Sequence, residues 1–225
     1  MKKSSFVFIV FCFMFIFAAP KADCTLKMLG TPSIAKAVFN QKSFVFMGAD
    51  FSKVRLIGDH GQGSGTNMPI DYIRDTYFNS YNETILNETK KFDIEGATGG
   101  RKITYDFNSV VEINKTADTS SMKIMTKTEP LDTEVIRGML KKYKTASTEQ
   151  IGLVIIADQM NKYDKEAYYY VIFFDVQYRE IVFGAYVKGS AGGFGYKNFW
   201  VNTIYEVLKS MKKKDWEYWE HTIKG

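Results

Sequence analysis

The chain has 225 residues and a formal net charge of +5, with 45% apolar and 16% aromatic residues. This length indicates one domain, or at most two small ones, and this composition is sufficient for a buried core. The positive charge is concentrated in residues 1–22, because removing Lys2, Lys3 and Lys21 from the 30 basic residues leaves 27 against 25 acidic ones, a net charge of +2. A remainder so close to neutral lacks the basic excess typical of nucleic-acid-binding proteins, so no nucleic-acid partner is predicted.

The first residues have the layout of a secretory signal peptide. Lys2-Lys3 precedes an apolar run from Phe6 to Ala19, and small residues follow the run. A run of about 14 residues is short for a membrane span, which needs about 20. We therefore expect residues 1–22 to be a signal peptide and residues 23–225 to form a single α/β domain that is periplasmic or secreted. The small residues do not form a good cleavage site, so an uncleaved amino-terminal membrane anchor is the alternative.

The chain contains two cysteines, Cys12 in the apolar run and Cys24 just after it. Loss of Cys12 with the leader would leave Cys24 alone, so no intramolecular disulfide is expected. A lone cysteine after a leader raises the question of a lipoprotein. The preceding residues, Lys21-Ala22-Asp23, lack the leucine of a bacterial lipobox, and lipidation of Cys24 is therefore not predicted.

The first half of the chain predicts strands and one long helix around a glycine-rich loop. Residues 34–39 could form a short helix or a strand, and Ser43–Met47 is rich in β-forming residues. Lys53–Gly58 either continues that strand or pairs with it. After the loop at residues 58–67, apolar residues at spacings of three and four predict a helix from about Ile70 to Lys90.

The middle of the chain predicts a loop and several short elements. Residues 93–101 contain three glycines and are predicted as loop. Lys102–Phe107 alternates apolar and polar residues, which is strand periodicity, and Val110–Ile113 predicts a second short strand. Met122–Thr128 is predicted as an edge strand because of its lysines. A helix from about Thr133 to Thr145 follows.

The last third of the chain has the clearest pattern. Ile151–Ala157 and Tyr168–Phe174 are apolar on both faces, as in the central strands of a covered sheet, with a polar connection at residues 158–166. Glu180–Val187 must return antiparallel after so short a turn, and the helix of Trp200 follows. We therefore predict an α/β (α+β) fold with a mixed, largely antiparallel sheet, about three helices packed on it, and a carboxy-terminal β-hairpin followed by a helix.

A glycine-rich turn, Gly189–Gly195, connects the hairpin to this last helix. Gly192, Gly193 and Gly195 could surround an anionic ligand with backbone N–H groups, since helix amino termini bind anions. The turn matches neither the dinucleotide-binding pattern nor the P-loop, and it follows an antiparallel hairpin instead of lying in a βαβ unit. We interpret its glycines as structural, allowing a sharp turn and a close approach of the Trp200 helix, with ligand binding as the alternative.

Asp59 and His60, in the first glycine-rich loop, are the residue pair that most resembles a catalytic site. A general acid or base needs a partner and a pocket, and the sequence shows neither. We expect His60 to be an exposed loop residue, with a ligand site or a hydrolase as alternatives. The serine-hydrolase pattern Gly-x-Ser-x-Gly fails around Ser64, because the position that requires glycine is Gln62. No zinc or calcium motif occurs, and neither a metal nor a cofactor is predicted.

Two further groups of residues have a structural and a binding interpretation. Trp216, Tyr218 and Trp219 lie in a charged terminal helix, where they either cap the core or form a surface for a partner or a membrane. Lysines cluster at residues 141–144 and 212–214, late in predicted helices. There they can complement the helix dipole, and an anion-binding surface patch is the alternative.

Three Asn-x-Thr sequences begin at Asn82, Asn87 and Asn114. They would be glycosylation sites only in a eukaryotic secretory pathway. Because the leader is of a bacterial type, no glycan is predicted.

Residues 151–211 resemble uncharacterised secreted proteins of Gram-negative bacteria. In those proteins a hairpin of the form FFD…R.I precedes a helix of the form G.AGGFG…W…I..VL, and this chain has both. The overall layout is also loosely similar to periplasmic α/β domains of the TolB amino-terminal and curli-assembly-lipoprotein kind. This second similarity is one of topology, and neither resemblance implies catalytic residues.

Three functional hypotheses follow. The first is a non-enzymatic exported domain that binds a protein or another component of the cell envelope, and it predicts an exposed aromatic or edge-strand surface. The second is a binder of a small molecule or a glycan that uses the loops Gly58–Thr66 and Gly192–Gly195, and it predicts that the two loops converge. The third is a hydrolase that uses His60, which requires a carboxylate or a serine beside the ring. In all three, contact with a membrane is expected only through an uncleaved leader.

Overall fold

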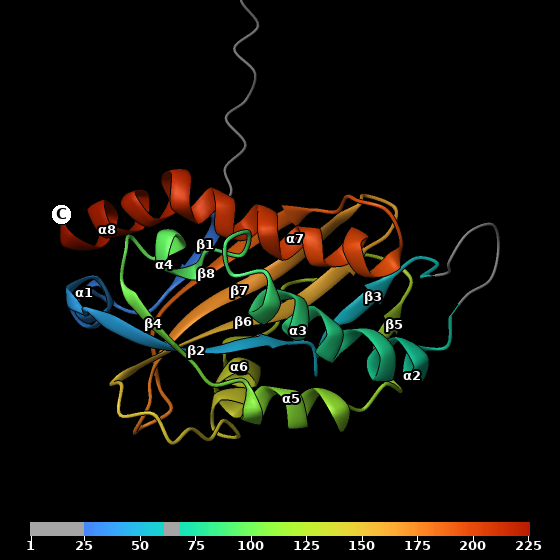
Figure 1. Cartoon of the computed structure of the whole chain (residues 1–225), viewed down its shortest axis with the longest axis horizontal. Coiled ribbons are helices and arrows are strands. Elements are labelled where there is room, and N and C mark those ends of the chain that lie inside the picture. The colour runs from blue at the N-terminus through green and yellow to red at the C-terminus, as the bar shows by residue number, and fades with distance from the viewer. Residues whose placement is uncertain (1–24, 61–67) are drawn as a thin grey trace, which may run out of the picture.

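A computed structural model describes residues 25–60 and 68–225, with side chains described from Lys27 onward. The predicted signal peptide, Cys24 and residues 61–67 of the glycine-rich loop lie outside the described residues. In the described part of the chain the fold is α/β, with an eight-stranded mixed sheet and six helices (Figure 1). The predicted fold class is confirmed, with more helices than the three or so that the periodicity indicated.

The sheet combines long antiparallel strands with shorter parallel ones. Its main order is β1-β8-β7-β6-β2-β4, and β3 pairs with both β6 and β5. Pairing is antiparallel from β1 through β8 and β7 to β6, and parallel between β6, β2 and β4 and between β6, β3 and β5. The strands are β1 Thr25–Leu29, β2 Ser43–Asp50, β3 Arg55–Ile57, β4 Lys102–Tyr105, β5 Lys123–Ile124, β6 Ile151–Asn161, β7 Glu166–Asp175 and β8 Ile181–Ser190.

Strands β2 and β3 lie one after the other along the same edge of β6. Strand β2 pairs with residues 152–156 of β6, and β3 pairs with residues 159–161. A tight turn with a hydrogen bond from Val54 N to Phe51 O joins the two strands. Of the two alternatives for residues 53–58, continuation of the first strand is therefore the one that the structure has.

Helices cover both faces of the sheet. One face carries α1 (Pro32–Asn40), α4 (Ile94–Ala97) and two long helices, α2–η1–α3 and α7–η2–α8. The other carries α5 (Asn108–Lys115) and α6 (Thr133–Leu140). Figure 1 shows α7 and α8 along one side of the sheet and α5 and α6 along the other. The segments of the long helices are α2 Ile70–Ile73, η1 Arg74–Phe78, α3 Asn79–Asn87, α7 Tyr196–Ser210, η2 Met211–Asp215 and α8 Trp216–Lys224, where η denotes a π-helical turn.

The predicted central position of the carboxy-terminal hairpin is confirmed. Along β7, Tyr169, Val171 and Phe173 pack with the cluster under α7, and the alternate residues Tyr170 and Ile172 pack with the cluster under α6. Side chains that alternate between two buried faces explain why the strand is apolar throughout. The same holds for β6, which is buried along its whole length and continues to Asn161, into the segment predicted as a polar connection.

Two of the predicted element types are wrong, and one alternative that the sequence leaves open is decided. Val110–Ile113 is not a strand but part of helix α5, in which Val110 packs against the sheet and Asn114, one turn later, is also buried. The β-branched residues favour strands by intrinsic propensity, and their packing against the sheet overrides it. The predicted loop at residues 93–101 contains the short helix α4, which Asp93 caps through a hydrogen bond from Gly96 N to Oδ1. Residues 34–39, left open between helix and strand, lie in helix α1.

The structural interpretation of the glycine-rich turn agrees with the close packing of α7 on β8. A Cβ atom at Gly189 would collide with the backbone oxygen of Thr203 on α7. Gly195, the residue before the helix, has φ +81°, a conformation that other residues rarely adopt. These two glycines therefore set the distance and the entry angle of α7.

Candidate functional site

His60 is a buried residue that joins three elements, and the expectation of an exposed loop residue is wrong. Its side chain is 2% exposed and stacks on the Trp200 ring at a centroid distance of 5.1 Å. Its Nδ1 lies 2.8 Å from the Tyr196 hydroxyl, and its Nε2 lies 3.2 Å from the backbone oxygens of Ile57 and Met160. The imidazole therefore connects β3, β6 and the first turn of α7.

These contacts assign the tautomer of His60 and leave its ring nitrogens occupied. Two carbonyl oxygens can only accept, so we assign the proton to Nε2, and Nδ1 then accepts from the Tyr196 hydroxyl. Burial lowers the pKa of His60 to about 4 and raises that of Tyr196, which keeps the imidazole neutral and the phenol protonated. The ring nitrogens thus bond to a phenol and to backbone carbonyls, whereas the hydrolase hypothesis requires a carboxylate or a serine beside the ring.

The two glycine-rich loops meet in their described parts. His60 belongs to the first loop and Tyr196 directly follows Gly195, so the hydrogen bond between them joins the loops. Asp59, the neighbour of His60, is exposed. Gly192 N donates to Phe199 O, which folds the second loop back on α7, while Gly193 and Gly195 are exposed. A shared ligand pocket at these loops stays a prediction, because residues 61–67 lie outside the described residues.

Two of the three aromatic residues proposed as a partner surface are buried. Trp219 is fully buried and Trp216 is 3% exposed, both in the core cluster beneath the α7–η2–α8 helix. Tyr218 is 54% exposed. A surface role for the two tryptophans is therefore wrong, because their helical spacing turns them toward the sheet and leaves only Tyr218 outside.

The carboxyl end of β2, where α/β sheets commonly bind ligands, is filled by side chains of the protein itself. The buried amides of Asn82 and Asn114 bond to the backbone that follows Gly48. Asp50 is fully buried and accepts hydrogen bonds from the Tyr143 hydroxyl and from Ser52 N, both at 2.7 Å. Burial raises the pKa of Asp50. The backbone and the carboxylate at the end of β2 are therefore bonded to side chains and backbone of the protein itself.

Residues 25–60 and 68–225 contain neither a cluster of metal-binding side chains nor a helix that could span a membrane. No three histidine, cysteine, aspartate or glutamate side chains lie close enough together there to hold a metal ion. Over the same residues, no helix has the length and the apolar character that crossing a bilayer requires.

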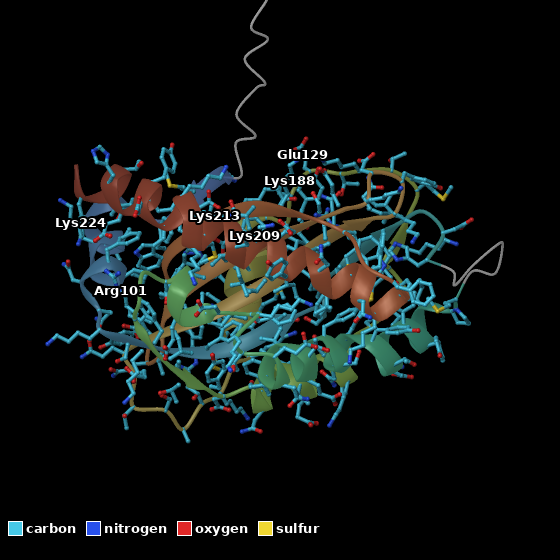
Figure 2. All side chains as sticks on the ribbon, turned by 45° about the horizontal axis from the view of Figure 1, so that its top comes forward. Arg101, Glu129, Lys188, Lys209, Lys213 and Lys224 are labelled. Atoms are coloured by element: carbon cyan, nitrogen blue, oxygen red, sulfur yellow. The ribbon has the colours of Figure 1, made fainter. Side chains whose placement is uncertain are left out.

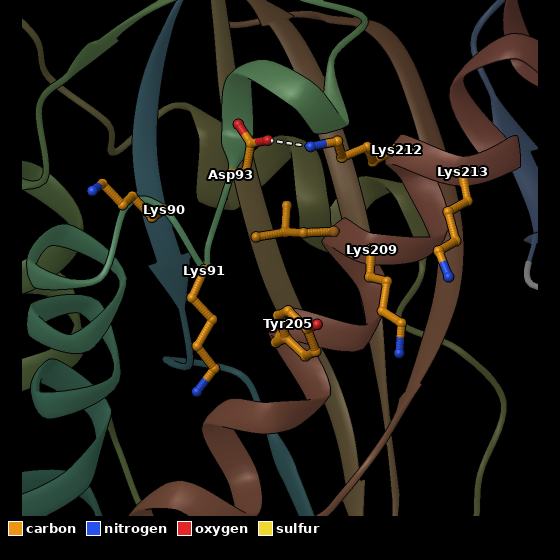
Figure 3. A pocket seen from close by; sticks show the side chains of 8 residues that line it. Lys90, Lys91, Asp93, Tyr205, Lys209, Lys212 and Lys213 are labelled. Carbon is orange, nitrogen blue, oxygen red and sulfur yellow. Dashed lines mark hydrogen bonds and ion pairs between the residues drawn. The ribbon is translucent and has the colours of Figure 1, made fainter.

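The surface feature with the most distinctive chemistry is a cleft of about 420 Å³ beside α7, which we name the lysine cleft. One wall is the turn after α3, and the opposite wall is the end of α7 with the π-helical turn η2 (Figure 3). Figure 2 shows Lys209 and Lys213 on this helix. The lining residues are Lys90, Lys91, Asp93, Tyr205, Leu208, Lys209, Lys212 and Lys213.

Positive charge dominates the lysine cleft. Five lysines line it, against the single carboxylate of Asp93. The Lys212 ammonium lies 2.7 Å from Asp93 Oδ2 and lowers the pKa of that carboxyl, with help from the Gly96 N–H (Figure 3). Within the described residues Lys90 and Lys213 have no carboxylate within ion-pair distance. These two charges are therefore available to a ligand.

The floor of the lysine cleft is partly apolar. Leu208 and the Tyr205 ring form it, and the Tyr205 ring packs edge to face on Phe92. The Lys91 and Lys209 ammonium groups lie 5.8 Å and 5.4 Å from the Tyr205 ring centroid, within the range of cation–π attraction. Each also has a carboxylate partner on its own segment, Glu88 for Lys91 and Glu206 for Lys209. The cleft thus combines an aromatic floor with a cationic rim.

Two further grooves have a different character. A groove of about 510 Å³ shares Lys90 and Asp93 with the lysine cleft, and Glu95 and Tyr105 also line it, so its carboxylates outnumber its single ammonium group. A groove of about 570 Å³ lies between α1, residues 147–151 and the β7–β8 turn and is lined mainly by uncharged residues. Of the three, only the lysine cleft has an excess of positive charge.

The sequence contained only part of the signal for the lysine cleft. The prediction that residues 212–214 complement a helix dipole is wrong, because the helix continues to Lys224 and the dipole acts only near its last turn. Their anion-binding alternative is the one that agrees with the cleft. The opposite wall, Lys90 and Lys91, lies more than 100 residues away in sequence, and no local pattern connects the two walls. Comparison of the chain with protein-family models, with curated proteins and with solved structures found no match.

Proposed function

We propose that the protein is a non-enzymatic binding domain of the bacterial cell envelope, exported by its leader, that binds a ligand carrying several negative charges in the lysine cleft. The observation that carries the proposal is that five lysines and a single carboxylate line a cavity of about 420 Å³. Lysines on two walls surround a bound anion without requiring one fixed geometry, because an ammonium group acts as a point charge.

The chemistry of the lysines favours phosphate or clustered carboxylate groups. The carboxylates beside Lys91, Lys209 and Lys212 keep these side chains near the cleft without burying them, whereas Lys90 and Lys213 are unpaired in the described part of the chain. A ligand that reaches Lys90 and Lys213 therefore gains two unpaired charges. The Tyr205 and Leu208 floor would contact the uncharged part of such a ligand.

A binding function is favoured over catalysis because the candidate catalytic residues are engaged in structural contacts. Both ring nitrogens of His60 have partners, and its lowered pKa makes it a weak base. Asp50 is sealed in the core by Tyr143 and Ser52. The lysine cleft itself is lined by neither a histidine, a cysteine nor a serine.

Titration calorimetry with tripolyphosphate tests the proposal. The double substitution Lys90→Gln/Lys213→Gln is expected to weaken binding about tenfold or more, because two unpaired charges near the anion are lost. Binding to the unsubstituted protein is expected to weaken with added salt. The matched control is Lys141→Gln/Lys144→Gln, which removes the same charge from exposed positions outside the described cavities.

The control distinguishes a defined site from general attraction of anions. Equal loss of affinity in both double variants would show that net charge alone attracts the anion, and the proposed site would be wrong. The same conclusion would follow if the unsubstituted protein bound no tripolyphosphate at low salt.

A further inference from the structure

Exposed aromatic side chains lie at the end of the sheet where β6 and β8 finish and β7 begins. Phe194 is 95% exposed and Tyr163 is 68% exposed, among the most exposed large apolar side chains of the described residues. Phe194 stands between Gly193 and Gly195, whose positive φ angles shape the turn that projects it. Tyr163 lies in the turn between β6 and β7, against Gly58. We name the surface formed by Tyr163, Phe194, Phe199, Lys162 and Lys165 the aromatic tip.

Backbone contacts hold the turns of the aromatic tip together. Ala191 N donates to Lys165 O at 2.7 Å, which joins the glycine-rich turn to the β6–β7 turn. The Lys162 ammonium lies 4.0 Å from the centroid of the Phe199 ring at the start of α7. The buried His60–Tyr196 hydrogen bond supports the same region from below. The exposed rings are therefore carried by a braced platform and do not belong to a separate flexible arm.

Charge and shape indicate the kind of partner. The turns that form the tip carry Lys162 and Lys165, with Lys197 in the first turn of α7, against the carboxylates of Asp59 and Asp164. The Asp164 carboxylate already accepts a hydrogen bond from the Asn161 amide. The large exposed fractions of Phe194 and Tyr163 show that the tip projects these two rings outward. Projecting aromatic rings beside lysines suit the interface of a lipid bilayer with anionic headgroups.

We propose that the aromatic tip docks the protein on an anionic membrane surface, with Phe194 inserted among the lipid chains and Lys162 and Lys165 at the headgroups. This contact is distinct from the predicted leader, and it does not depend on the ligand of the lysine cleft. Insertion buries the Phe194 side chain, which is 95% exposed in the structure, and the hydrophobic effect favours that burial.

A tryptophan introduced at the tip reports this insertion directly. The test uses the full chain carrying Phe194→Trp and vesicles of phosphatidylglycerol and phosphatidylethanolamine. The emission of the new indole is expected to shift to shorter wavelength and to be quenched by brominated acyl chains. The three native tryptophans are buried and form a constant background. Tyr218→Trp, at an exposed position on α8, is the matched control and is expected to show neither effect.

The reporter separates tip docking from attachment through the leader. If the protein sediments with the vesicles while the indole at position 194 stays accessible to an aqueous quencher, attachment occurs elsewhere and the proposal is overturned. Absence of vesicle binding overturns it as well. As a second measure, Phe194→Ser is expected to lower the partition coefficient about tenfold or more, the loss that corresponds to one buried phenylalanine. Lys162→Gln/Lys165→Gln is expected to weaken binding to these vesicles and to leave binding to pure phosphatidylcholine unchanged.

Discussion

The side-chain amide of Asn82 makes with Ala49 the two hydrogen bonds that a neighbouring strand would make. Its Oδ1 accepts from Ala49 N at 2.7 Å, and its Nδ2 donates to Ala49 O at 2.9 Å. Asn114 extends this pairing, because its Oδ1 accepts from Phe51 N and its Nδ2 donates to Ala49 O. Strand β4 pairs with β2 only as far as Phe46, so these amides from α3 and α5 satisfy the backbone where β4 has ended.

The first prediction concerns these amides. Asn82→Ala is expected to lower the free energy of unfolding by about 2–4 kcal/mol, because a buried N–H and a buried C=O lose a partner. Asn87→Ala is the control, since Asn87 also begins an Asn-x-Thr sequence but is exposed. Its effect is expected to stay within about 0.5 kcal/mol. Urea unfolding measures both, and equal stability of the two variants would contradict the pairing described above.

The second prediction concerns pH. The pKa of His60 is lowered from 6.5 to about 4 by burial, so the folded state resists protonation that the unfolded chain accepts. The stabilisation is complete above pH 6.5 and is lost as the pH falls from 6.5 to 4, by about 3 kcal/mol in total. Unfolding free energies measured across this range are expected to fall steeply in the unsubstituted protein and in His221→Gln.

A variant isolates the contribution of His60. His60→Gln is expected to be less stable at neutral pH and to show a shallower decline toward pH 4. The comparison is needed because the pKa of Asp50 is raised by burial, and a raised carboxyl pKa favours the folded state as the pH falls. An equally steep decline in His60→Gln would assign the pH dependence to other groups.

The third prediction compares Gly189 and Gly138, whose replacement by alanine is expected to change stability in opposite directions. Gly189→Ala is expected to lower the free energy of unfolding by about 3 kcal/mol or more, because the new Cβ would overlap the Thr203 backbone oxygen and push α7 off β8. Gly138→Ala is expected to raise it by about 0.5–1 kcal/mol, since Gly138 lies inside α6 with nothing within 4 Å. Thermal or urea unfolding measures both, and destabilisation by Gly138→Ala would contradict the open space at that position.

The fourth prediction concerns the one carboxylate of the lysine cleft. Asp93→Asn is expected to raise the affinity for tripolyphosphate about threefold to tenfold, because it removes a negative charge and releases Lys212. Asparagine also caps helix amino termini, so α4 is expected to keep its cap. Glu95→Gln, a neutralisation just outside the lysine cleft, is the control for net charge. Calorimetry that showed equal gains in both variants would contradict a direct effect of Asp93.

The local pattern of the sequence was sufficient for the carboxy-terminal third. Successive side chains of the strand Tyr168–Phe174 point to opposite faces of the sheet, whichever strands lie beside it. The turn that follows is so short that the next strand can only return antiparallel. Helix α7 was equally predictable, because its apolar stripe repeats at 3.6 residues. The predicted type was wrong at residues 110–113, where intrinsic propensity and tertiary packing disagree.

The tertiary structure alone decided where the candidate sites lie. Whether His60 is exposed depends on Tyr196 and Trp200, more than 130 residues away, and the burial that lowers its pKa exists only once α7 has packed. The lysine cleft likewise forms between the turn of Lys90 and the helix of Lys213, which come together because two helices cover the same face of the sheet. By itself the sequence determined periodicity, turn chemistry and the apolar leader, because these depend on neighbouring residues. Burial, charge clustering and the tip at Phe194 depend on contacts between distant segments, and only the folded chain could establish them.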